Sequence, residues 1–543
     1  MRRIIAARQD GLCSRLGAIL NAMYISKKTG KDFYYYWPES EEQMKLWENI
    51  KNKNNFRSIE CELEKNIFSN NFIQNYSLGD TFQNPGLPYG LKQPKFSFKA
   101  SLDELALRNE DCFISHVPCY SYIEDIDKEE YYREMKAFWR QVEFTSKIQE
   151  IIQTAKAKAD KLDNFIAIHV RIADVALNQA YKNTGYFVYK FSPLELVFEL
   201  IKQEIQDYNI VLFSDDFDGI KILKNYCLEN NFKKVYLIDE FIKINLNSET
   251  ERAFFELAFM ICAKKIYTGD SNFSKFASRV GLGREATYIS EVFSNQERYD
   301  LIFKNKNNKL KLKPLQEAYK FLYLYTRGKL IKRSWVELEQ ILVQALALDP
   351  FNNLYKIGIL ECLLNQKNYM HAEEYTKKII KDNNFLKDLL HPMMIFKDSF
   401  FKILSSVDNQ YENLYLLYLT MSKKFNFKIK GAPARVKKHL AYKLGQAMIE
   451  NSKNILGYIR MPFVLMKIYT RYKKEQKTYR ILINVNSNLL LPKLKEYADY
   501  KEALKLKEHL SYKLGEALIK ANKNWYNGGY IKLWFEILKL KKT

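Results

Sequence analysis

The 543-residue sequence has few residues of the types that interrupt or cross-link a chain. Its 19 glycines and 12 prolines are too few for a collagen-like or linker-dominated protein. Its 47% hydrophobic content is too high for general disorder. The 7 cysteines are scattered and form no C-x-x-C pair. This pattern indicates a reduced intracellular protein rather than a disulfide framework or a zinc site.

Long apolar runs and the common catalytic motifs are also missing. No stretch approaches the ~18 apolar residues of a membrane-spanning helix. The first apolar run ends at Arg8, too early for a signal peptide. We therefore expect a cytoplasmic protein, either free or held peripherally on the inner face of the cytoplasmic membrane. Neither a phosphate-binding G-x-x-x-x-G-K-[ST] nor a G-x-S-x-G or H-E-x-x-H motif is present.

The formal net charge of +23 is confined to one part of the chain. Residues 1–300 carry a net charge of −3, residues 301–430 carry +10, and residues 431–543 carry +16. The basic character therefore belongs to a C-terminal appendage and not to the N-terminal half. We expect no nucleic-acid partner.

The N-terminal half reads as two successive α/β regions, 1–160 and 161–302. In the first, an apolar run at 4–7, a polar loop, a helical pattern ended by Gly30 and an aromatic run at 33–37 predict a strand–helix–strand unit with parallel strands. Residues 50–130 look irregular and include a Pro/Gly cluster at 84–90, which we interpret as insertions that shape an acceptor pocket. In the second region the expected strands are Phe165–Val170, Ile210–Phe213, Val235–Ile238, Lys265–Thr268 and Thr287–Ile289.

Two helical regions follow a Lys/Asn-rich linker at 304–309. Region 303–430 contains two similar helix ends, at 346–352 and 379–383, spaced close to the ~34-residue period of tetratricopeptide repeats. It is either a surface for a protein partner or self-association, or a plain helical bundle. Region 431–543 contains a duplication, because 439–454 returns as 509–524. The expected fold class is α/β plus all-α: a GT-B-type pair of Rossmann-like domains, a helical repeat region and a basic helical tail.

The most informative string begins in the strand at 165–170. It continues as His169-Val170-Arg171-Ile172-Ala173-Asp174, which places a histidine, a guanidinium and a carboxylate at the mouth of a sheet. A guanidinium bonds two phosphate oxygens at once and keeps its charge, so it suits a departing diphosphate. Many strands also end in a structural Arg–Asp pair, so the spacing alone leaves both interpretations open.

The string resembles the His-x-Arg-x-x-Asp motif of fucosyltransferase-like glycosyltransferases, which have the GT-B fold. Three further segments resemble motifs of this family, in the same order, over residues 1–300: Asp10–Leu16, Val211–Asp216 and Thr268–Ala277. Cys13 and Ser14 stand where the family usually has Gly and Asn, and Asp270 and Asn272 also depart from its pattern, which leaves the transferred sugar open.

The resemblance implies a site for a nucleotide-diphosphate sugar, with a GDP-sugar favoured. The implied catalytic group is Arg171, His169, Asp174 and Asp10, of which Asp10 and Asp174 are the candidate general bases. The implied donor-binding residues are Gly11, Ser14, Arg15, Ser214, Asp215, Asp216, Asp270, Ser271, Asn272 and Ser274. The family usually needs no divalent metal, so we expect no cofactor. The Asp216-Phe217-Asp218 triplet keeps a metal-dependent alternative open.

The basic tail interleaves aromatic residues with lysines from 520 to 542. This composition suits an anionic membrane surface or single-stranded nucleic acid, and it also suits a plain amphipathic helix pair. Taken together, the sequence predicts a bacterial-type glycosyltransferase that acts on a surface polysaccharide or a lipid-linked glycan. The alternatives are a non-catalytic helical-repeat adaptor with a relic transferase domain, or a transferase of a non-sugar phosphoryl-type group.

Overall fold

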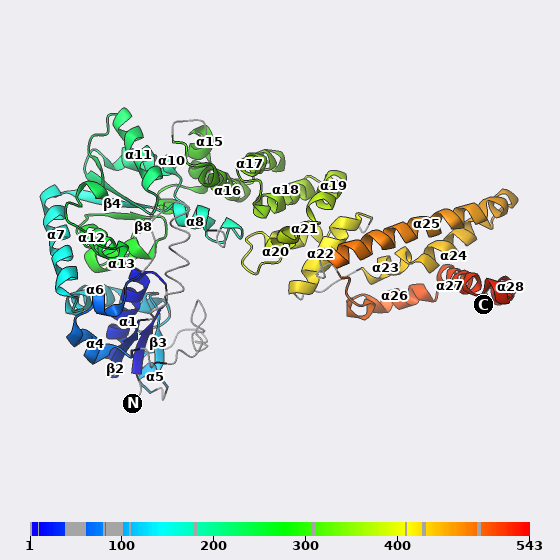
Figure 1. The fold of residues 1–543 in the computed structure, drawn as a ribbon, viewed down its shortest axis with the longest axis horizontal. Coiled ribbons are helices and arrows are strands. Elements are labelled where there is room, and N and C mark those ends of the chain that lie inside the picture. The colour runs from blue at the N-terminus through cyan, green and yellow to red at the C-terminus, as the bar shows by residue number, and fades with distance from the viewer. Residues whose placement is uncertain are drawn as a thin grey trace. The chain divides into compact units, whose positions relative to one another are not determined.

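The computed structural model divides the chain into two compact units (Figure 1). The first unit comprises Met1–Arg333 with Gln344–Pro350, and the second comprises Ser334–Val343 with Phe351–Thr543. The structure describes residues 3–8, 10–37, 61–79, 82, 101–107, 110–178, 182–305, 310–407, 410–425, 431–485 and 490–542. The Pro/Gly cluster at 84–90 lies outside these ranges, as do residues 306–309 of the expected linker.

The first unit begins with a three-stranded parallel sheet. Its strands are β1 (Arg3–Ala7), β2 (Asp32–Tyr36) and β3 (Cys112–Ile114), in the order β2-β1-β3. Helix α1 (Leu12–Thr29) connects β1 to β2 and ends at Gly30, whose φ of 67° is the left-handed conformation that glycine adopts without strain. The predicted strand–helix–strand unit is confirmed. Strand β3 was not predicted, because its three residues lie in a region without a clear hydrophobic period.

A five-stranded parallel sheet follows in the same unit. Its order is β6-β5-β4-β7-β8, so β4 is the central strand. The expected strands are confirmed to within two residues: β4 (Phe165–Val170), β5 (Asn209–Ser214), β6 (Val235–Leu237), β7 (Ile266–Thr268) and β8 (Thr287–Tyr288). Strand β4 is buried along most of its length, as expected for an apolar run covered on both faces.

Helices surround the two sheets. Between β2 and β4 in the chain, the helices are α3 (Glu64–Ile67), α4 (Asn70–Tyr76), α5 (Leu102–Leu107), α6 (Lys128–Gln141) and α7 (Ser146–Leu162). After β4, the helices of this unit are α8 (Ala173–Leu177), α10 (Leu194–Glu204), α11 (Phe217–Glu229), α12 (Glu249–Ile261), α13 (Asn272–Gly281), α14 (Ile289–Val292), α15 (Asn295–Asn305) and α16 (Pro314–Leu330).

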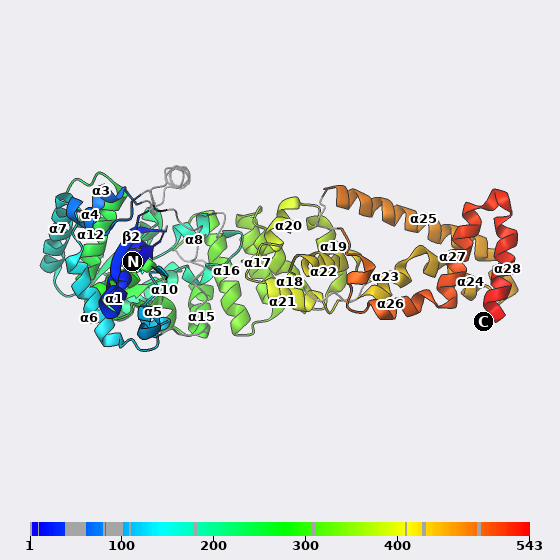
Figure 2. The same ribbon diagram turned by 90° about the horizontal axis from the view of Figure 1, so that it is seen from below.

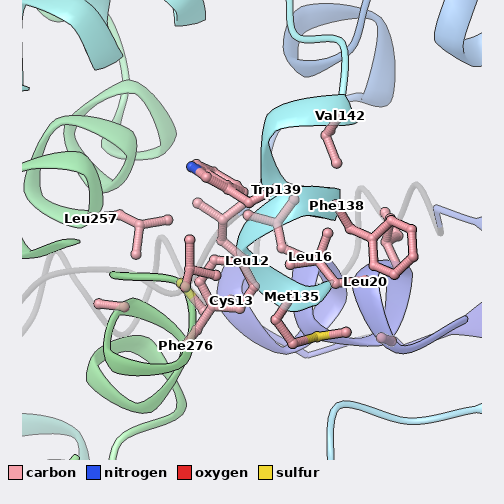
Figure 3. Packing of buried hydrophobic residues seen from close by; sticks show 14 of the residues in the cluster. Leu12, Cys13, Leu16, Leu20, Met135, Phe138, Trp139, Val142, Leu257 and Phe276 are labelled. Atoms are coloured by element: carbon pink, nitrogen blue, oxygen red, sulfur yellow. The ribbon is translucent and has the colours of Figure 1, made fainter. Parts of the chain in front are cut away.

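One continuous hydrophobic core joins the two sheets. It includes buried residues of β1 and β2 as well as of β4 and β5. Between the sheets, α1 and α6 pack against α13, which in turn packs against α12. Figure 3 shows the side chains of Trp139, Leu257 and Phe276 in this region. The rings of Trp139 and Phe276 make an edge-to-face contact with centroids 5.5 Å apart. This core fixes α13 next to α1, so that the first turns of both helices face the same region.

The second unit is helical (Figure 2). After α17 (Trp335–Leu348), its helices are α18 (Asn353–Asn365), α19 (Tyr369–Ile379), α20 (Asn383–Leu389), α21 (Lys397–Leu404), α22 (Glu412–Phe425), α23 (Ala432–Lys438), α24 (Leu440–Asn451), α25 (Ile455–Val485), α26 (Tyr500–Lys507), α27 (Leu510–Lys523) and α28 (Gly529–Lys542). Both helix ends that suggested repeats lie at junctions between helices, α17–α18 and α19–α20. The tetratricopeptide assignment and the domain boundaries at 160, 302 and 430 stay predictions.

The duplicated sequence forms a pair of helices that cross each other at glycine. A Cβ built on Gly445 of α24 would overlap the carbonyl oxygen of Ser511, and a Cβ built on Gly515 of α27 would overlap that of Ala441. In the duplication, position 445 corresponds to 515 and position 441 corresponds to 511. The contact is therefore reciprocal, as in a two-fold arrangement of two identical parts. The backbones approach this closely only because both crossing positions lack a side chain.

The matched histidines at 439 and 509 occupy equivalent positions, each at the N-cap of a duplicated helix. The ring of His439 stacks on Tyr512, with centroids 5.6 Å apart. Within the described ranges, no group of three or more His, Cys, Asp or Glu residues has a geometry that could hold a metal ion. Nor is any helix there both long enough and apolar enough to cross a membrane.

Candidate active site

The predicted site residues follow three neighbouring strands of the second sheet. Arg171 comes directly after β4, Ser214 ends β5, and Asp270 follows β7 by two residues. Since all the strands are parallel, their carboxyl ends lie at one edge of the sheet, where ligands bind in open α/β folds. The sheet topology thus brings together segments that are about 100 residues apart in the sequence.

Arg171 is held by the last residue of its own motif. Its Nε donates to Oδ1 and Oδ2 of Asp174 at 2.9 and 3.1 Å, and its Nη2 also donates to Oδ2. The two side chains are only 18% and 9% exposed. A guanidinium bound in this two-pronged manner has a fixed plane, which is what directional binding of a phosphate group requires.

Asp215 supports the same loop from the next strand. Its carboxylate accepts hydrogen bonds from the backbone N–H groups of Ile172 and Asp174, at 2.9 and 2.8 Å. Burial and the negative charge of Asp174 raise the pKa of Asp215 to about 7. Burial also disfavours the charge on Asp174, but Arg171 outweighs it, so the pKa of Asp174 is lower than usual. The two carboxyl groups therefore differ in their proton affinity.

Asp216 faces away from this region. Its carboxylate caps the start of α11 by accepting from the N–H of Asp218 at 3.2 Å, and it accepts from Nε2 of Gln316 at 2.7 Å. Asp218 forms an ion pair with Lys313 at 2.6 Å. Both carboxylates of the Asp-x-Asp triplet thus have partners at the start of α16. The metal-dependent alternative and the expected absence of a cofactor stay predictions.

The first predicted loop lies opposite the sheet edge. Gly11 is the N-cap residue of α1. Asp10 forms an ion pair with Arg8 at 2.5 Å; although burial opposes its ionisation, this pair keeps the pKa of Asp10 below its usual value. Arg15 points elsewhere, because its guanidinium donates to the Asp10 carbonyl at 2.8 Å and lies over the ring of Trp37. Arg15 stabilises the loop from behind.

The start of α13 forms the third wall of the candidate site, beside the sheet edge and the first loop. Ser271 caps this helix. The Nδ2 of Asn272 donates to Oγ of Ser14 at 2.8 Å, so it ties α13 to α1, and it lies 3.1 Å from Nε2 of His116. Burial and the charge of Arg8 lower the pKa of His116 to about 4, so the ring is neutral at pH 7 and its Nε2 accepts from the Asn272 amide.

Ser274 and Asp270 have structural partners. Ser274 is fully buried, and its Oγ lies 2.7 Å from the hydroxyl oxygen of Thr268. Asp270 has a positive φ of 62° and forms an ion pair with Lys275. Neither side chain reaches the space between α1 and the sheet edge. Ser274 instead braces the turn that presents Ser271.

These elements enclose a cavity of about 300 Å³. The predicted residues that line it are Asp10, Gly11, Ser14, His169, Arg171, Asp174, Ser214, Asp215, Ser271 and Asn272. Arg15, Asp216, Asp270 and Ser274 do not line it. The first turns of α1 and α13 contribute backbone N–H groups with partial positive charge, which favour an anion.

Several other residues of the cavity wall were not predicted from the sequence, among them Lys190, Arg252, Glu256 and Phe273. Lys190 comes from a short 3₁₀ turn, Val188–Lys190, in a stretch with no clear periodicity. Burial and the charge of Arg171 lower the pKa of Lys190 to about 8. The ring of Phe273 stacks on His169, with centroids 5.7 Å apart. Phe273 could have been predicted, because it lies inside the Thr268–Ala277 segment between Ser271 and Ser274.

A second cavity, of about 240 Å³, lies beyond Asp270. Its walls include Tyr189, Tyr288 and Tyr323 together with Arg298 and Arg327. Burial and the nearby charge of Arg298 lower the pKa of Arg327. Ser192, whose Oγ accepts from the N–H of Arg171 at 3.3 Å, belongs to this second wall. The two cavities thus flank the Arg171 loop.

Comparison with known proteins adds little to this geometry. A family model described as a domain of unknown function, DUF8374, matches residues 363–543. No curated protein is significantly similar in sequence. Among solved structures, the crystal structure of fucosyltransferase NodZ from Bradyrhizobium matches 51% of this chain and 92% of that chain, with 16% sequence identity and a TM-score of 0.29. A superposition at this level does not establish a shared fold.

Proposed function

We propose that the first unit is a glycosyltransferase that moves a sugar from a nucleotide-diphosphate donor to a glycan acceptor. The observation that carries the proposal is the Arg171–Asp174 pair, fixed at the carboxyl edge of a parallel sheet and facing two helix N-termini across a cavity. Cationic groups and helix N-termini match a diphosphate, and a leaving diphosphate is where negative charge grows during sugar transfer.

The mixture of charges in the cavity favours a sugar nucleotide over a simple phosphate. Arg171, Lys190 and Arg252 are accompanied by the carboxylates of Asp10, Asp215, Glu249 and Glu256. Carboxylates would repel a bare phosphate, whereas they accept hydrogen bonds from sugar hydroxyls. The same carboxylates supply a general base for the acceptor hydroxyl.

Three carboxyl groups are candidates for that base, and their surroundings rank them. Asp174 is engaged with Arg171, so we assign it a positioning role. Asp10 is paired with Arg8 and holds its proton weakly. Asp215 has a pKa of about 7, which suits proton transfer near neutral pH. Comparison of Asp10→Asn with Asp215→Asn decides between them: the variant that lacks the base loses turnover while it still binds the donor.

The donor is the first unknown to resolve. A thermal-shift screen against GDP-, UDP-, CMP- and dTDP-sugars should show stabilisation by one nucleotide class, with a GDP-sugar as the first candidate. Arg171→Ala should abolish both this stabilisation and sugar transfer while the protein stays folded. Arg140→Ala, at an exposed position of α6 outside the cavity, is the matched comparison for the loss of one arginine and should keep both the stabilisation and the transfer. If no nucleotide stabilises the wild-type protein, the proposal fails.

We place the acceptor among surface polysaccharides and lipid-linked glycans, and the enzyme on the cytoplasmic side of the membrane. The adaptor alternative makes a different prediction, because Arg171→Ala should then leave partner binding through residues 314–430 intact and change nothing else. A phosphoryl-type transferase would release a nucleoside monophosphate from its donor. With a nucleoside-diphosphate donor, analysis of the released nucleotide therefore separates it from a glycosyltransferase, which releases the nucleoside diphosphate.

A further inference from the structure

The duplication in the second unit extends into two helix faces that are exposed in the same way. With an offset of 72 residues, the first turns of α25 correspond to α28. Tyr458 and Tyr530 are 55% and 51% exposed, and Phe463 and Phe535 are 76% and 66% exposed. The pairs Ile459/Ile531 and Met466/Leu538 are exposed too. We call these two sets the paired apolar faces.

Each face is held in place by the same local contact. A Cβ built on Gly457 would overlap the carbonyl oxygen of Asn451, and one built on Gly529 would overlap that of Ala521. Asn451 and Ala521 are themselves equivalent positions in the duplicated helices α24 and α27. Each exposed helix therefore leaves its preceding helix at the same point. The inward side is also matched, since Met461 and Leu533 are less exposed than their neighbours on the outward side.

Basic residues accompany both faces at matched positions. Arg460 corresponds to Lys532, and Lys467 corresponds to Lys539; all four are exposed. Before α28, Trp525 and Tyr526 are 68% and 74% exposed. Large apolar and aromatic side chains flanked by cations are the composition of a helix that lies in the interface of an anionic bilayer. Lysines near such a surface are attracted by the negative potential of the anionic lipids.

We propose that the paired apolar faces dock this protein on the surface of a bilayer that contains anionic lipids. Phe463 and Phe535 enter the interface, and the matched basic residues lie at the level of the lipid phosphates. A second copy of the chain is a poorer occupant, because residues 431–543 carry a net charge of +16 and two such modules repel each other face to face.

Two faces in one chain bind more tightly than one. Helix α28 and the beginning of α25 lie at the same end of the second unit (Figures 1 and 2), so a single surface is within reach of both. Once one face is docked, the second meets the bilayer at a high effective concentration. This proposal does not rest on sugar transfer.

Cosedimentation of the full-length protein with vesicles tests the proposal. Vesicles of phosphatidylcholine with about 30% phosphatidylglycerol should bind the protein at low salt, phosphatidylcholine alone should not, and added salt should weaken binding. Phe463→Ser and Phe535→Ser should each lower the apparent affinity ~10-fold, and the double variant should lower it further. Phe351→Ser, at a position that is 89% exposed on another part of the unit, is the matched control and should bind normally.

A charge swap gives an independent measurement. Lys467→Glu with Lys539→Glu should abolish binding to anionic vesicles. Lys377→Glu on α19 with Lys381→Glu just beyond its end changes the net charge equally and should retain most of the binding. Arg171→Ala should bind vesicles like the wild type, so a failure of the transferase proposal would be seen separately.

Two results would overturn the docking proposal. One is no binding of the wild-type protein to the anionic vesicles at low salt. The other is a dimer in sedimentation velocity that Phe463→Ser and Phe535→Ser convert to monomer while vesicle binding is unchanged, which would assign the faces to a second copy.

Discussion

The backbone N–H of Asp174 donates to the carboxylate of Asp215 at 2.8 Å, while the carboxylate of Asp174 accepts hydrogen bonds from the guanidinium of Arg171. Two acidic residues thus hold the loop that follows β4. Asp174 does so through the guanidinium of Arg171, and Asp215 does so through backbone N–H groups. Burial and the charge of Asp174 raise the pKa of Asp215, whereas Arg171 lowers the pKa of Asp174. This division of roles leads to the first two predictions.

Replacement of Arg171 should destabilise the protein unless Asp174 is changed as well. Arg171→Met leaves a buried carboxylate without its cation, and we expect the free energy of unfolding to fall by about 3 kcal/mol. The double variant Arg171→Met with Asp174→Asn should recover most of that loss, because no charge is then left unpaired. Urea denaturation of the wild type, Arg171→Met, Asp174→Asn and the double variant measures the coupling. If the loss in the double variant equals the sum of the losses in the two single variants, the pair contributes no net coupling.

The stability of the protein should depend on the protonation of Asp215. Its folded pKa of about 7 lies above the unfolded value of about 4, so the wild type loses stability as the pH rises between these values. Asp215→Asn removes this loss. The difference in Tm between variant and wild type should therefore become more positive from pH 5 to pH 8. Asp207→Asn, at an exposed aspartate before β5, should show no such trend.

Lys190 should make donor binding sensitive to alkaline pH. With a pKa of about 8, it is charged at pH 7 and loses its charge as the pH rises through 8. The affinity of the wild type for a nucleoside diphosphate should then fall above pH 8. Lys190→Met should bind ~10-fold more weakly at pH 7, and its affinity should be flat up to pH 9.5. Isothermal titration calorimetry compares it with Lys202→Met, whose lysine is 45% exposed on α10.

Phe276 should link the stability of the core to donor binding. Phe276→Ala leaves a cavity between α13, α1 and α6, and we expect a loss of about 3–4 kcal/mol in the free energy of unfolding. Donor affinity should fall as well, since α13 presents Ser271 and Asn272 to the cavity. Leu228→Ala, at a position that is 46% exposed, should change stability by less than about 0.5 kcal/mol. If the donor affinity of Phe276→Ala were unaltered, the packing of the core would have no influence on donor binding.

The glycine crossing should be equally sensitive on both sides. Gly445→Ala and Gly515→Ala each place a methyl group on a backbone carbonyl, and each should cost about 1–3 kcal/mol. Because the contacts are reciprocal, the double variant should cost less than the sum of the two single variants. Gln446→Ala and Glu516→Ala change exposed positions next to these glycines and should be nearly neutral. The thermal unfolding transition of the second unit measures the stability of all five variants.

The sheets could be predicted because buried parallel strands are short apolar runs bounded by polar residues. The grouping of His169, Ser214 and Ser271 in one cavity could then be predicted as well, because the carboxyl ends of parallel strands lie at one edge of the sheet. Strand β3 was not predicted, because it lies within residues 50–130, a stretch that shows no clear hydrophobic period.

The directions of individual side chains could not be predicted. Arg15 and Asp216 lie on the predicted loops, yet each turns to a partner behind its loop, Trp37 and Gln316 respectively. Lys190 enters the cavity from a segment with no pattern at all. In the duplication the repeat itself was visible, but the carbonyls that face its glycines depend on the crossing of two helices.

The reciprocal crossing of α24 and α27 has the form of an isologous interface enclosed within one polypeptide. Two separate copies of such a module would associate only at sufficient protein concentration, and they would come apart on dilution. Here the linker makes that association intramolecular, so the paired state persists at any dilution. A segment that carries only one of the two halves should, by the same reasoning, seek the missing half in another molecule and form a symmetric homodimer.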